Sequence, residues 1–291
     1  MGGALALRRR CALPLPFRPS VMSHAILALD LGNSTCQLAW VAAPGDGGAV
    51  EVILRLPCSQ DLVRELTEWF DSHPIPPGTC AALSSVASEA QTGDVLNLLT
   101  RIPGCKPCVQ PPAGLDLRLN DPSGVGCDRL YAARAALELS GMPTVVVDAG
   151  TALTVDVVQP PSDSGAGHLR GEFLGGAIAP GPRLLAEALA LGGARLPRVD
   201  GRPGVPALGK DTSSALEAGI GVGLEGAALH LVRRVADEAG LEQPATVLTG
   251  GAASFLRAVL CAAAPGPWFE DPDLVLRGLA ASAREIQDGG L

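Results

Sequence analysis

The sequence lacks any uninterrupted apolar run near the roughly 20 residues that a bilayer-spanning helix needs, although 47% of its 291 residues are hydrophobic. It also lacks an excess of positive charge, since 30 acidic and 22 basic residues give a formal net charge of -8. A chain with this charge has no excess of basic residues for non-specific binding of nucleic acid. The composition therefore predicts a soluble protein whose partners include no membrane and no nucleic acid. The same composition still allows the protein to bind a small phosphorylated ligand at a local basic site.

Metal-ligand spacing is missing as well. Cys105 and Cys108 form one C-x-x-C pair, but no second pair stands at zinc spacing among the eight cysteines. Most of the cysteines lie in apolar surroundings, as Cys36 and Cys80 do, so we predict structural or incidental thiols in a reducing cytoplasm. The histidines have no ligand-like spacing and are assigned no role: His24, His73, His168 and His230.

The first 21 residues differ from everything after them. They contain three consecutive arginines, no acidic residue, and prolines that break any helix. An export signal would need an uninterrupted apolar segment, and ALPLPF is short and broken by proline. A transit peptide, which is also rich in arginine and poor in acids, stays open as an alternative. Met22 offers a simpler start, because it lies just before the first predicted strand, and we expect residues 1–21 to lie outside the fold.

Two blocks of strands and helices follow, each in the same order. Tight connections between short strands predict antiparallel neighbours, and the helices show apolar residues at helical spacing. The first block has predicted strands over 25–31, 36–43, 50–56 and 79–86, helices over 61–70, 89–99 and 127–140, and a loop over 102–114. The second has strands over 144–149, 153–158, 170–178 and 246–250 and helices over 182–190, 212–239, 251–262 and 273–286. The repeat predicts two duplicated α/β domains, over 22–140 and 141–291.

The stretches ILALDLGNSTCQLAW and TVVVDAGTALTVDVV share one pattern, in which an apolar run ends in Asp-x-Gly and hydroxyl residues before a second apolar run. A carboxylate at the tip of a buried strand is costly unless something pairs with it. Glycine lets backbone N–H groups approach an anion, and hydroxyls add donors, so each hairpin could hold phosphate. Asp30 and Asp148 then require a cation, most simply Mg²⁺ with its water shell. The alternative is a plain turn between strands, which two equivalent copies disfavour.

Two more glycine-rich segments extend this pattern. Gly175 and Gly176 are predicted at a strand end, before a helix whose N–H groups are open to an anion, and Gly250 and Gly251 follow another strand. In series with the two D-x-G hairpins they predict a nucleotide cleft between the domains. The residues predicted to bind the nucleotide and its phosphates are Asp30, Gly32, Asn33, Ser34, Thr35, Gly150, Thr151, Gly175, Gly176, Gly250 and Gly251.

The ordered motifs DLGNST, GCDR, DAGTALTVD, LGGAIAPG, GKDT and LTGG resemble those of the bacterial type III pantothenate kinases, within the actin, sugar-kinase and chaperone ATPase superfamily. The resemblance covers residues 25–285, and G-x-D-R at 126–129 is its most specific part. It implies two duplicated ribonuclease-H-like, actin-like ATPase domains that face each other across a nucleotide cleft. It also implies ATP-dependent phosphorylation of pantothenate to 4'-phosphopantothenate, the first step of coenzyme A biosynthesis, in the cytoplasm.

The same resemblance implies roles for individual residues. Asp128 would be the general base and Arg129 would hold the carboxylate of pantothenate, in a substrate site that also includes Gly126, Cys127 and Thr212. A carboxylate near the hydroxyl and a guanidinium that binds carboxylate bidentately suit phosphoryl transfer to such a substrate. The alternative is a helix start in which Asp128 caps free N–H groups and Arg129 lies on a solvated face.

Cations and a second subunit are implied too. Beside the Mg²⁺ already predicted at Asp30, the family resemblance implies a monovalent cation, K⁺ or NH₄⁺, near Asp148, which could also hold Mg²⁺. It implies a homodimer with the pantothenate site at the subunit interface. Thr212 would contribute to that site, or Asp211 and Thr212 would simply cap the long helix, and both roles could coexist.

The sequence departs from the family pattern at several positions. Ser34 stands where relatives usually have Thr, Ala132 where Asn is common, and Asp211 where Asn or Ser is more usual. The segment 109–119 lacks the glycine-rich loop that lines the substrate pocket in many relatives, which leaves the details of the pocket open. Two alternatives therefore stand beside a pantothenate kinase: a kinase for another carboxylate-bearing alcohol, and a non-catalytic regulator.

Overall fold

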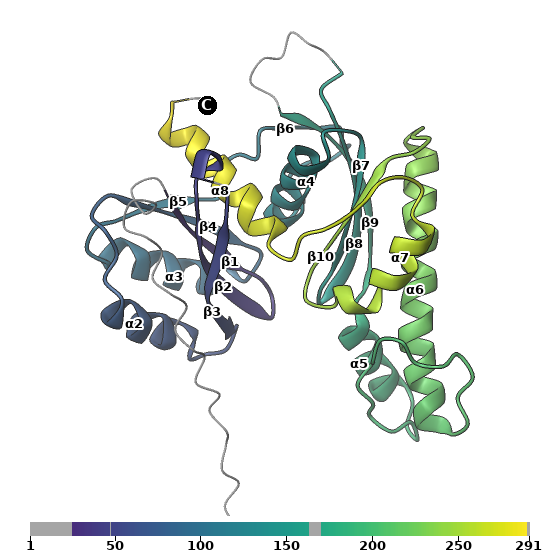
Figure 1. Ribbon diagram of the computed structural model, residues 1–291. Coiled ribbons are helices and arrows are strands. Elements are labelled where there is room, and N and C mark those ends of the chain that lie inside the picture. The colour runs from purple at the N-terminus through teal and green to yellow at the C-terminus, as the bar shows by residue number, and fades with distance from the viewer. Residues whose placement is uncertain (1–24, 47, 163–169, 290–291) are drawn as a thin grey trace, which may run out of the picture.

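Two mixed β-sheets with the same strand order form the protein (Figure 1). The computed structural model describes residues 25–46, 48–162 and 170–289, so the predicted extension over 1–21, the start at Met22, and His24 and His168 lie outside the described residues. The first sheet has the order β3-β2-β1-β4-β5, and the second has the order β11-β10-β7-β8-β9-β6.

The pairing directions also repeat. In the first sheet β1 is antiparallel to β2, β2 is antiparallel to β3, and β4 and β5 run parallel to β1. In the second sheet β7, β8, β9, β10 and β11 reproduce these relations, and β6 adds a further parallel strand beside β9. The predicted duplicated α/β fold is therefore confirmed, while the domain boundary at residue 140 stays a prediction.

The strand bounds agree with most of the predicted ranges. The strands of the first sheet are β1 (Ile26–Leu31), β2 (Thr35–Val41), β3 (Val50–Pro57), β4 (Thr79–Ser85) and β5 (Cys105–Val109). The strands of the second are β6 (Leu115–Leu117), β7 (Thr144–Ala149), β8 (Ala152–Gln159), β9 (Gly171–Pro180), β10 (Ala245–Thr249) and β11 (Trp268–Glu270).

Helices cover both faces of each sheet, which explains why the central strands are almost entirely apolar. The helices are α2 (Leu62–Ser72), α3 (Glu89–Arg101), α4 (Cys127–Ser140), α5 (Pro182–Gly192), α6 (Thr212–Glu238), α7 (Arg257–Ala263) and α8 (Leu274–Gln287), with short 3-10 turns η1 (Pro44–Asp46) and η2 (Ala253–Phe255). Alternate residues of β1 point to opposite faces: Leu27 packs in one cluster with α2 and α3, and Ile26 in another with α4 and α8.

Helix α4 lies between the two sheets, with α8 beside it (Figure 1). Tyr131 of α4 packs under the first sheet, whereas Ala133 and Ala136 of the same helix pack under the second. Helix α4 ends at Gly141, whose φ of 68° is the left-handed conformation that favours glycine at a helix end. The sequence Gly141-Met142-Pro143, a glycine followed shortly by a proline, predicts a helix stop at this position. The helix that begins with the GCDR motif is thus held by both halves of the protein.

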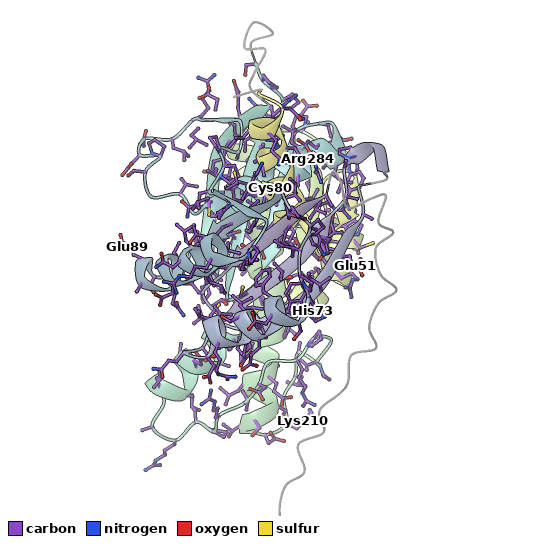
Figure 2. The ribbon with its side chains drawn as sticks, turned by 90° about the vertical axis from the view of Figure 1, so that its left-hand side faces the viewer. Glu51, His73, Cys80, Glu89, Lys210 and Arg284 are labelled. Carbon is purple, nitrogen blue, oxygen red and sulfur yellow. The ribbon has the colours of Figure 1, made fainter. Side chains whose placement is uncertain are left out.

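The C-terminal helix α8 returns to the first sheet. The Arg284 guanidinium donates to the carbonyl oxygens of Val41 and Ala42, at 2.6 and 2.7 Å. Cys80 of β4 lies close to Arg284 (Figure 2), and the two residues line one cavity. The last element of the chain therefore completes the core of the N-terminal half.

The long helix α6 packs against the second sheet through Leu224, Ala228 and Val232. Its 27 residues are long and apolar enough to cross a membrane by length and composition alone, with 33% of the most apolar window buried inside the protein. A core helix of a soluble protein passes the same test, so this helix by itself does not indicate a membrane protein.

Three short strands and one helix differ from the predictions. The predicted loop over 102–114 contains β5, an edge strand in which Pro107 is tolerated because edge strands need fewer N–H donors. Strands β6 and β11 have only three residues each, too few for a periodic pattern. The predicted helix over 251–262 is divided into η2 and α7. The cysteines of the described chain are free thiols, and Cys105 and Cys108 lie on β5.

Candidate active site

The two D-x-G hairpins meet between the sheets. Each turn is closed by a glycine N–H, with Gly32 donating to the Thr35 carbonyl at 3.0 Å and Gly150 donating to that of Ala152 at 2.9 Å. The hydroxyl oxygens of Ser34 and Thr151 lie 2.9 Å apart. Two turns that lie more than a hundred residues apart in the sequence are thereby brought together, as the repeat predicts.

A guanidinium lies beside this contact. Arg183, on the first turn of α5, donates from Nη2 to Ser34 Oγ at 2.8 Å. Its closest carboxylate partner is Glu187 at 3.9 Å, one helical turn further on. Helix α5 begins after Gly181 with Pro182 in its first turn, as the sequence predicts. A positive charge and a helix N-terminus are therefore both available where the hairpins meet.

Four carboxylates gather behind the hairpins. Asp30 and Asp148 each lie one residue before the end of their strands, β1 and β7, while Asp128 lies in the first turn of α4 and Asp156 lies within β8. Desolvation, together with the charges of the other three carboxylates, raises the pKa of Asp148 to about 7. Desolvation likewise raises the pKa of Asp30 to about 7, opposed by Ser84 and assisted by Asp128. This concentration of negative charge favours a cation.

An unpartnered carboxylate oxygen also indicates a cation site. Asp30 Oδ1 is buried and has no hydrogen-bond partner, which is costly unless a ligand supplies one. The described residues contain no group of three or more His, Cys, Asp or Glu placed to hold a metal ion by themselves. Such a site suits Mg²⁺, which usually takes only one or two carboxylates and completes its shell with water and phosphate oxygens.

The GCDR motif forms the first turn of α4. Gly126 is the N-cap residue, and Cys127 Sγ lies 3.4 Å from both Ser84 Oγ and the Ser85 carbonyl at the end of β4. Asp128 Oδ1 accepts a hydrogen bond from the Arg129 backbone N–H at 2.8 Å. A Cβ on residue 126 would lie 2.5 Å from Asp128 Oδ1. Glycine at this position therefore leaves room for the Asp128 carboxylate.

Asp128 belongs to the carboxylate cluster, and the Arg129 side chain points toward it. Desolvation raises the pKa of Asp128, while the neighbouring Arg129 lowers it by a smaller amount. The Arg129 side chain is only 16% exposed and is paired with Asp156. The alternative in which Arg129 lies on a solvated helix face is therefore wrong.

Asp156 is the site residue that the sequence reasoning missed. It accepts from Arg129 Nε at 3.1 Å and from Arg129 Nη2 at 2.5 Å, and it is 2% exposed. The guanidinium carbon also lies 5.6 Å from the centre of the Phe173 ring. The sequence does contain one signal for it, a single acid inside the apolar run TVDVV. A buried charge needs a partner, so an acid in an apolar strand indicates that another residue pairs with it.

The first of the two glycine pairs does not lie where the sequence predicts it. Gly175 and Gly176 lie inside β9, opposite Val157 and Asp156, so their predicted position at a strand end is wrong. A Cβ at residue 176 would overlap with Asp156 Oδ1 and with the Val155 carbonyl. Glycine is required here because the strand packs directly against the Asp156 carboxylate.

Gly250 follows β10 as predicted, in a left-handed conformation with φ of 95°. A Cβ there would overlap with Asp148 Oδ1 and with the Ala149 carbonyl, whereas Gly251 is exposed and has no atom within 4 Å of its Cβ position. The two glycines of this pair therefore differ, since only Gly250 lies against the carboxylate cluster.

Thr212 lies apart from the other predicted site residues. It is the first residue of α6, and Asp211 caps that helix by accepting from the Ser214 N–H at 2.8 Å. Thr212 is exposed, and among the described residues it makes no hydrogen bond to the GCDR motif or to the hairpins. Lys210, which precedes the cap, lies at the end of the molecule opposite Arg284 (Figure 2). Asp211 therefore caps α6, as the capping alternative expects, and the substrate role of Thr212 stays a prediction.

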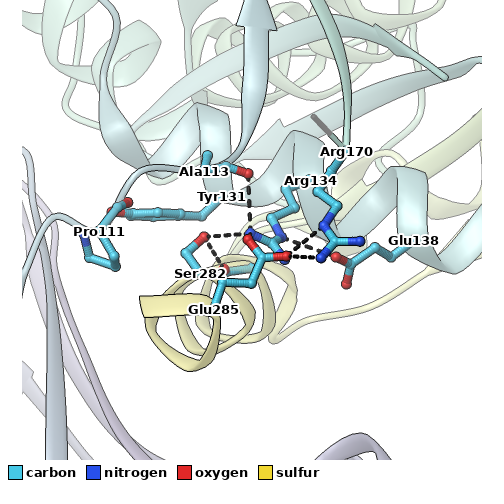
Figure 3. Close-up of polar contacts among 9 residues, drawn as sticks. Pro111, Ala113, Tyr131, Arg134, Glu138, Arg170, Ser282 and Glu285 are labelled. Atoms are coloured by element: carbon cyan, nitrogen blue, oxygen red, sulfur yellow. Dashed lines mark hydrogen bonds and ion pairs between the residues drawn. The ribbon is translucent and has the colours of Figure 1, made fainter. Parts of the chain in front are cut away.

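A polar network anchors α4 behind the site (Figure 3). Tyr131 donates to the Pro111 carbonyl at 2.8 Å, and Arg134 Nη1 donates to the Ala113 carbonyl at 3.3 Å and to Glu285 of α8 at 2.8 Å. Both carbonyls belong to the segment 109–119, in which the sequence departs from the family pattern. The helix that carries Asp128 is therefore fixed to this segment and to the C-terminal helix.

Two sheets with the same strand order, whose hairpins meet beside buried carboxylates, define the class of the protein as a duplicated α/β fold. A protein described as a putative Baf family transcriptional activator from Campylobacter jejuni has a similar fold, with a TM-score of 0.55 and 20% identity over 90% of this chain and 100% of that one. A putative 2-dehydro-3-deoxygalactonokinase from Sinorhizobium meliloti gives a TM-score of 0.53 and 16% identity, over 90% and 96% of the two chains. These likenesses show the fold alone.

Sequence comparison gives the family. Residues 26–234 match the model of the type III pantothenate kinases. The type III pantothenate kinase of Thermus thermophilus is 34% identical over 268 residues, which cover 87% of this chain and 96% of the relative. That of Agathobacter rectalis is 28% identical over 266 residues, covering 87% and 95%. The chain belongs to the type III pantothenate kinase family, and its activity is the ATP-dependent phosphorylation of pantothenate, the first step of coenzyme A biosynthesis.

Proposed function

We propose that Asp128 is the general base of this kinase. It would take the proton from the terminal hydroxyl of pantothenate as that oxygen bonds to the γ-phosphorus of ATP, while the bond from the γ-phosphorus to the bridging oxygen breaks and ADP leaves. The position of Asp128 carries the proposal, since it faces the hairpins from the start of α4. Its raised pKa also brings it closer to neutral pH, where a general base works best.

Arg129 would hold the carboxylate of pantothenate. Asp156 occupies its Nε and one Nη2 donor, so the donors at the Nη1 end remain for a second carboxylate. Charge-assisted pairs of this kind are strong and fix the direction of the substrate. Gly126 and Cys127 would form the backbone wall beside it.

The hairpins would hold the phosphates of ATP through the backbone N–H groups and hydroxyls of Gly32 to Thr35 and of Gly150 and Thr151. Asp30 would hold Mg²⁺, and Asp148 would hold a monovalent cation, K⁺ or NH₄⁺, or share the Mg²⁺. When bound, these cations offset the negative charge of the phosphates. The unpartnered Asp30 Oδ1 and the charge of the cluster support this assignment. Gly175, Gly176, Gly250 and Gly251 would shape the cleft.

We also propose a homodimer, in which Thr212 of one subunit completes the pantothenate site of the other. Three exposed apolar side chains support it: Ile178, Leu191 and Leu208 are 63%, 88% and 70% exposed. They belong to the end of β9, the end of α5 and the loop before α6, and α5 packs against α6 (Figure 1). Light scattering of the purified protein, which we place in the cytoplasm, gives the oligomeric state.

The replacement Asp128→Asn tests the proposed base. It keeps the size of the side chain and removes its basicity, so kcat should fall by about 10²- to 10⁴-fold. The Kd for Mg-ATP, measured by calorimetry, should stay within about twofold, because Asp128 does not contact the phosphates in this proposal. The assay is pantothenate-dependent formation of ADP, with and without K⁺ or NH₄⁺. A variant that keeps its kcat would remove Asp128 from this role.

A further inference from the structure

We propose that Asp156 is a positioning residue for pantothenate, which holds the Arg129 guanidinium by one edge and presents its other end to the substrate carboxylate. The inference rests on the proposed role of Arg129. It assigns a function to a residue outside the hairpins and outside the GCDR motif.

The contact between the two side chains is close and enclosed. Asp156 accepts from Nε at 3.1 Å and from Nη2 at 2.5 Å, so both carboxylate oxygens are used. The Asp156 side chain is 2% exposed and that of Arg129 is 16% exposed. Solvent therefore screens this pair far less than it screens an exposed ion pair, and the planar fork of the guanidinium fixes its orientation.

The donors that remain define where a substrate can bind. A guanidinium has five N–H donors, and Asp156 takes the one on Nε and one on Nη2. Two donors on Nη1 and one on Nη2 are left, and they form a second fork for an incoming carboxylate. The guanidinium carbon also lies over the Phe173 ring, 5.6 Å from the ring centre. The guanidinium is thus held along one edge by Asp156 and lies over an aromatic ring, and its other end keeps free donors.

Asp156 also keeps Arg129 away from the proposed base. Asp128 is the next residue along the chain, and its carboxylate already accepts from the Arg129 backbone N–H. A guanidinium released from Asp156 would have Asp128 as a nearby unpaired carboxylate. Such a pair would occupy both the proposed base and the substrate anchor, so Asp156 separates the two roles.

The fold reserves space for this carboxylate. Asp156 is paired in register with Gly176 of β9, and a Cβ at residue 176 would overlap with Asp156 Oδ1. The neighbours of Asp156 on β8 are Val155 and Val157, which are both buried. The ion pair with Arg129 of α4 explains why an acidic residue, Asp156, lies in this apolar strand.

The variant Asp156→Asn tests the proposal. It replaces an acceptor by an amide whose N–H₂ faces the guanidinium donors, so Arg129 loses its fixed orientation. The KM for pantothenate should rise by about tenfold or more, with kcat within about threefold and the KM for ATP within about twofold. An analogue with a primary alcohol in place of the carboxylate should bind the wild type and D156N equally well, measured as a competitive inhibitor. A loss of kcat with an unchanged pantothenate KM would overturn the proposal.

Asp271→Asn is the matched control. Asp271 is 9% exposed and accepts from Arg277 Nε at 2.6 Å, so it too is a buried acid paired with an arginine, but it lies between β11 and α8 and the Arg277 side chain is 39% exposed. D271N should lower the Tm and leave both KM values unchanged. An equal rise of the pantothenate KM in D271N would mean that loss of any buried pair loosens the site, and it would refute a specific role for Asp156.

Arg129→Gln separates this inference from the proposed function. A normal pantothenate KM in R129Q would show that Arg129 does not hold the substrate, and both proposals would fail. A raised KM in R129Q with a normal KM in D156N would overturn only the role of Asp156. Should D156N not fold, the double variant R129Q/D156N removes both charges. Its pantothenate KM should equal that of R129Q, and a further rise would show that Asp156 acts independently of Arg129.

Discussion

The network around Arg134 allows a quantitative test of how α4 is held. Arg134→Met keeps most of the buried side-chain volume and removes the guanidinium, whose side chain is 3% exposed. Breaking a fully buried pair costs about 3–5 kcal/mol. Here Glu285 keeps Arg170 as a partner at 2.5 Å and Glu138 is half-exposed, so we expect about 2–3 kcal/mol. For a chain of this size that corresponds to a fall in Tm of about 5–10 °C, measured by circular dichroism.

Arg234→Met is the control for this prediction. Arg234 and Glu238 form a pair at 2.7 Å with the same i,i+4 spacing as Arg134 and Glu138, but their side chains are 58% and 70% exposed. An exposed pair contributes about 0.5 kcal/mol or less, so the Tm of R234M should stay within about 2 °C of the wild type. If the two variants unfold at the same temperature, burial does not strengthen the Arg134 network and the reasoning fails.

Two further predictions concern the carboxylate cluster. In the absence of ligands, the free energy of unfolding should fall as the pH rises from about 5 to about 8. The pKa values of Asp30 and Asp148 in the folded state are raised to about 7, above their ordinary values. The folded state therefore binds more protons than the unfolded chain in this range, and it loses stability as those protons dissociate. Denaturant titrations should show this slope flattened in Asp148→Asn, and an unchanged slope would contradict the assignment. Gly250→Ala should destabilise the protein by about 1–3 kcal/mol, since it combines a left-handed backbone with an overlap against Asp148. Gly251→Ala, which has open space at its Cβ position, should leave the Tm unchanged, and equal Tm values for the two variants would disprove the argument.

The sequence predicted the parts of the fold whose signal is local. Apolar runs that end in Asp-x-Gly marked β1 and β7, and the Gly-Met-Pro stop marked the end of α4. Strand β5 was missed because Pro107 and two cysteines interrupt its apolar pattern, although an edge strand accepts both. Three-residue strands such as β6 form only because a neighbouring strand is already in place, which no local pattern can indicate.

The site was predicted as far as its residues belong to motifs. The Asp30 and Asp148 hairpins were expected to face each other, and the contact between Ser34 and Thr151 agrees with that expectation. The role of Asp156 depends on Arg129, which lies on another element, and no spacing within β8 indicates that partner. The position of Gly176 was misjudged for the same reason, because its requirement comes from the carboxylate across the strand pair.

Three carboxylates of the cluster occupy space that a side chain would otherwise fill. Asp128 lies against Gly126, Asp148 against Gly250, and Asp156 against Gly176, so that a methyl group on any of these glycines would overlap with the acid. A side chain at any of these three positions would therefore displace the acid beside it, so each acid restricts its neighbouring position to glycine. Efforts to give this enzyme a new substrate by directed evolution have little freedom at these positions. Variation is better directed to the exposed positions of the segment 109–119, such as Pro112, because this segment contacts α4 through the backbone carbonyls of Pro111 and Ala113.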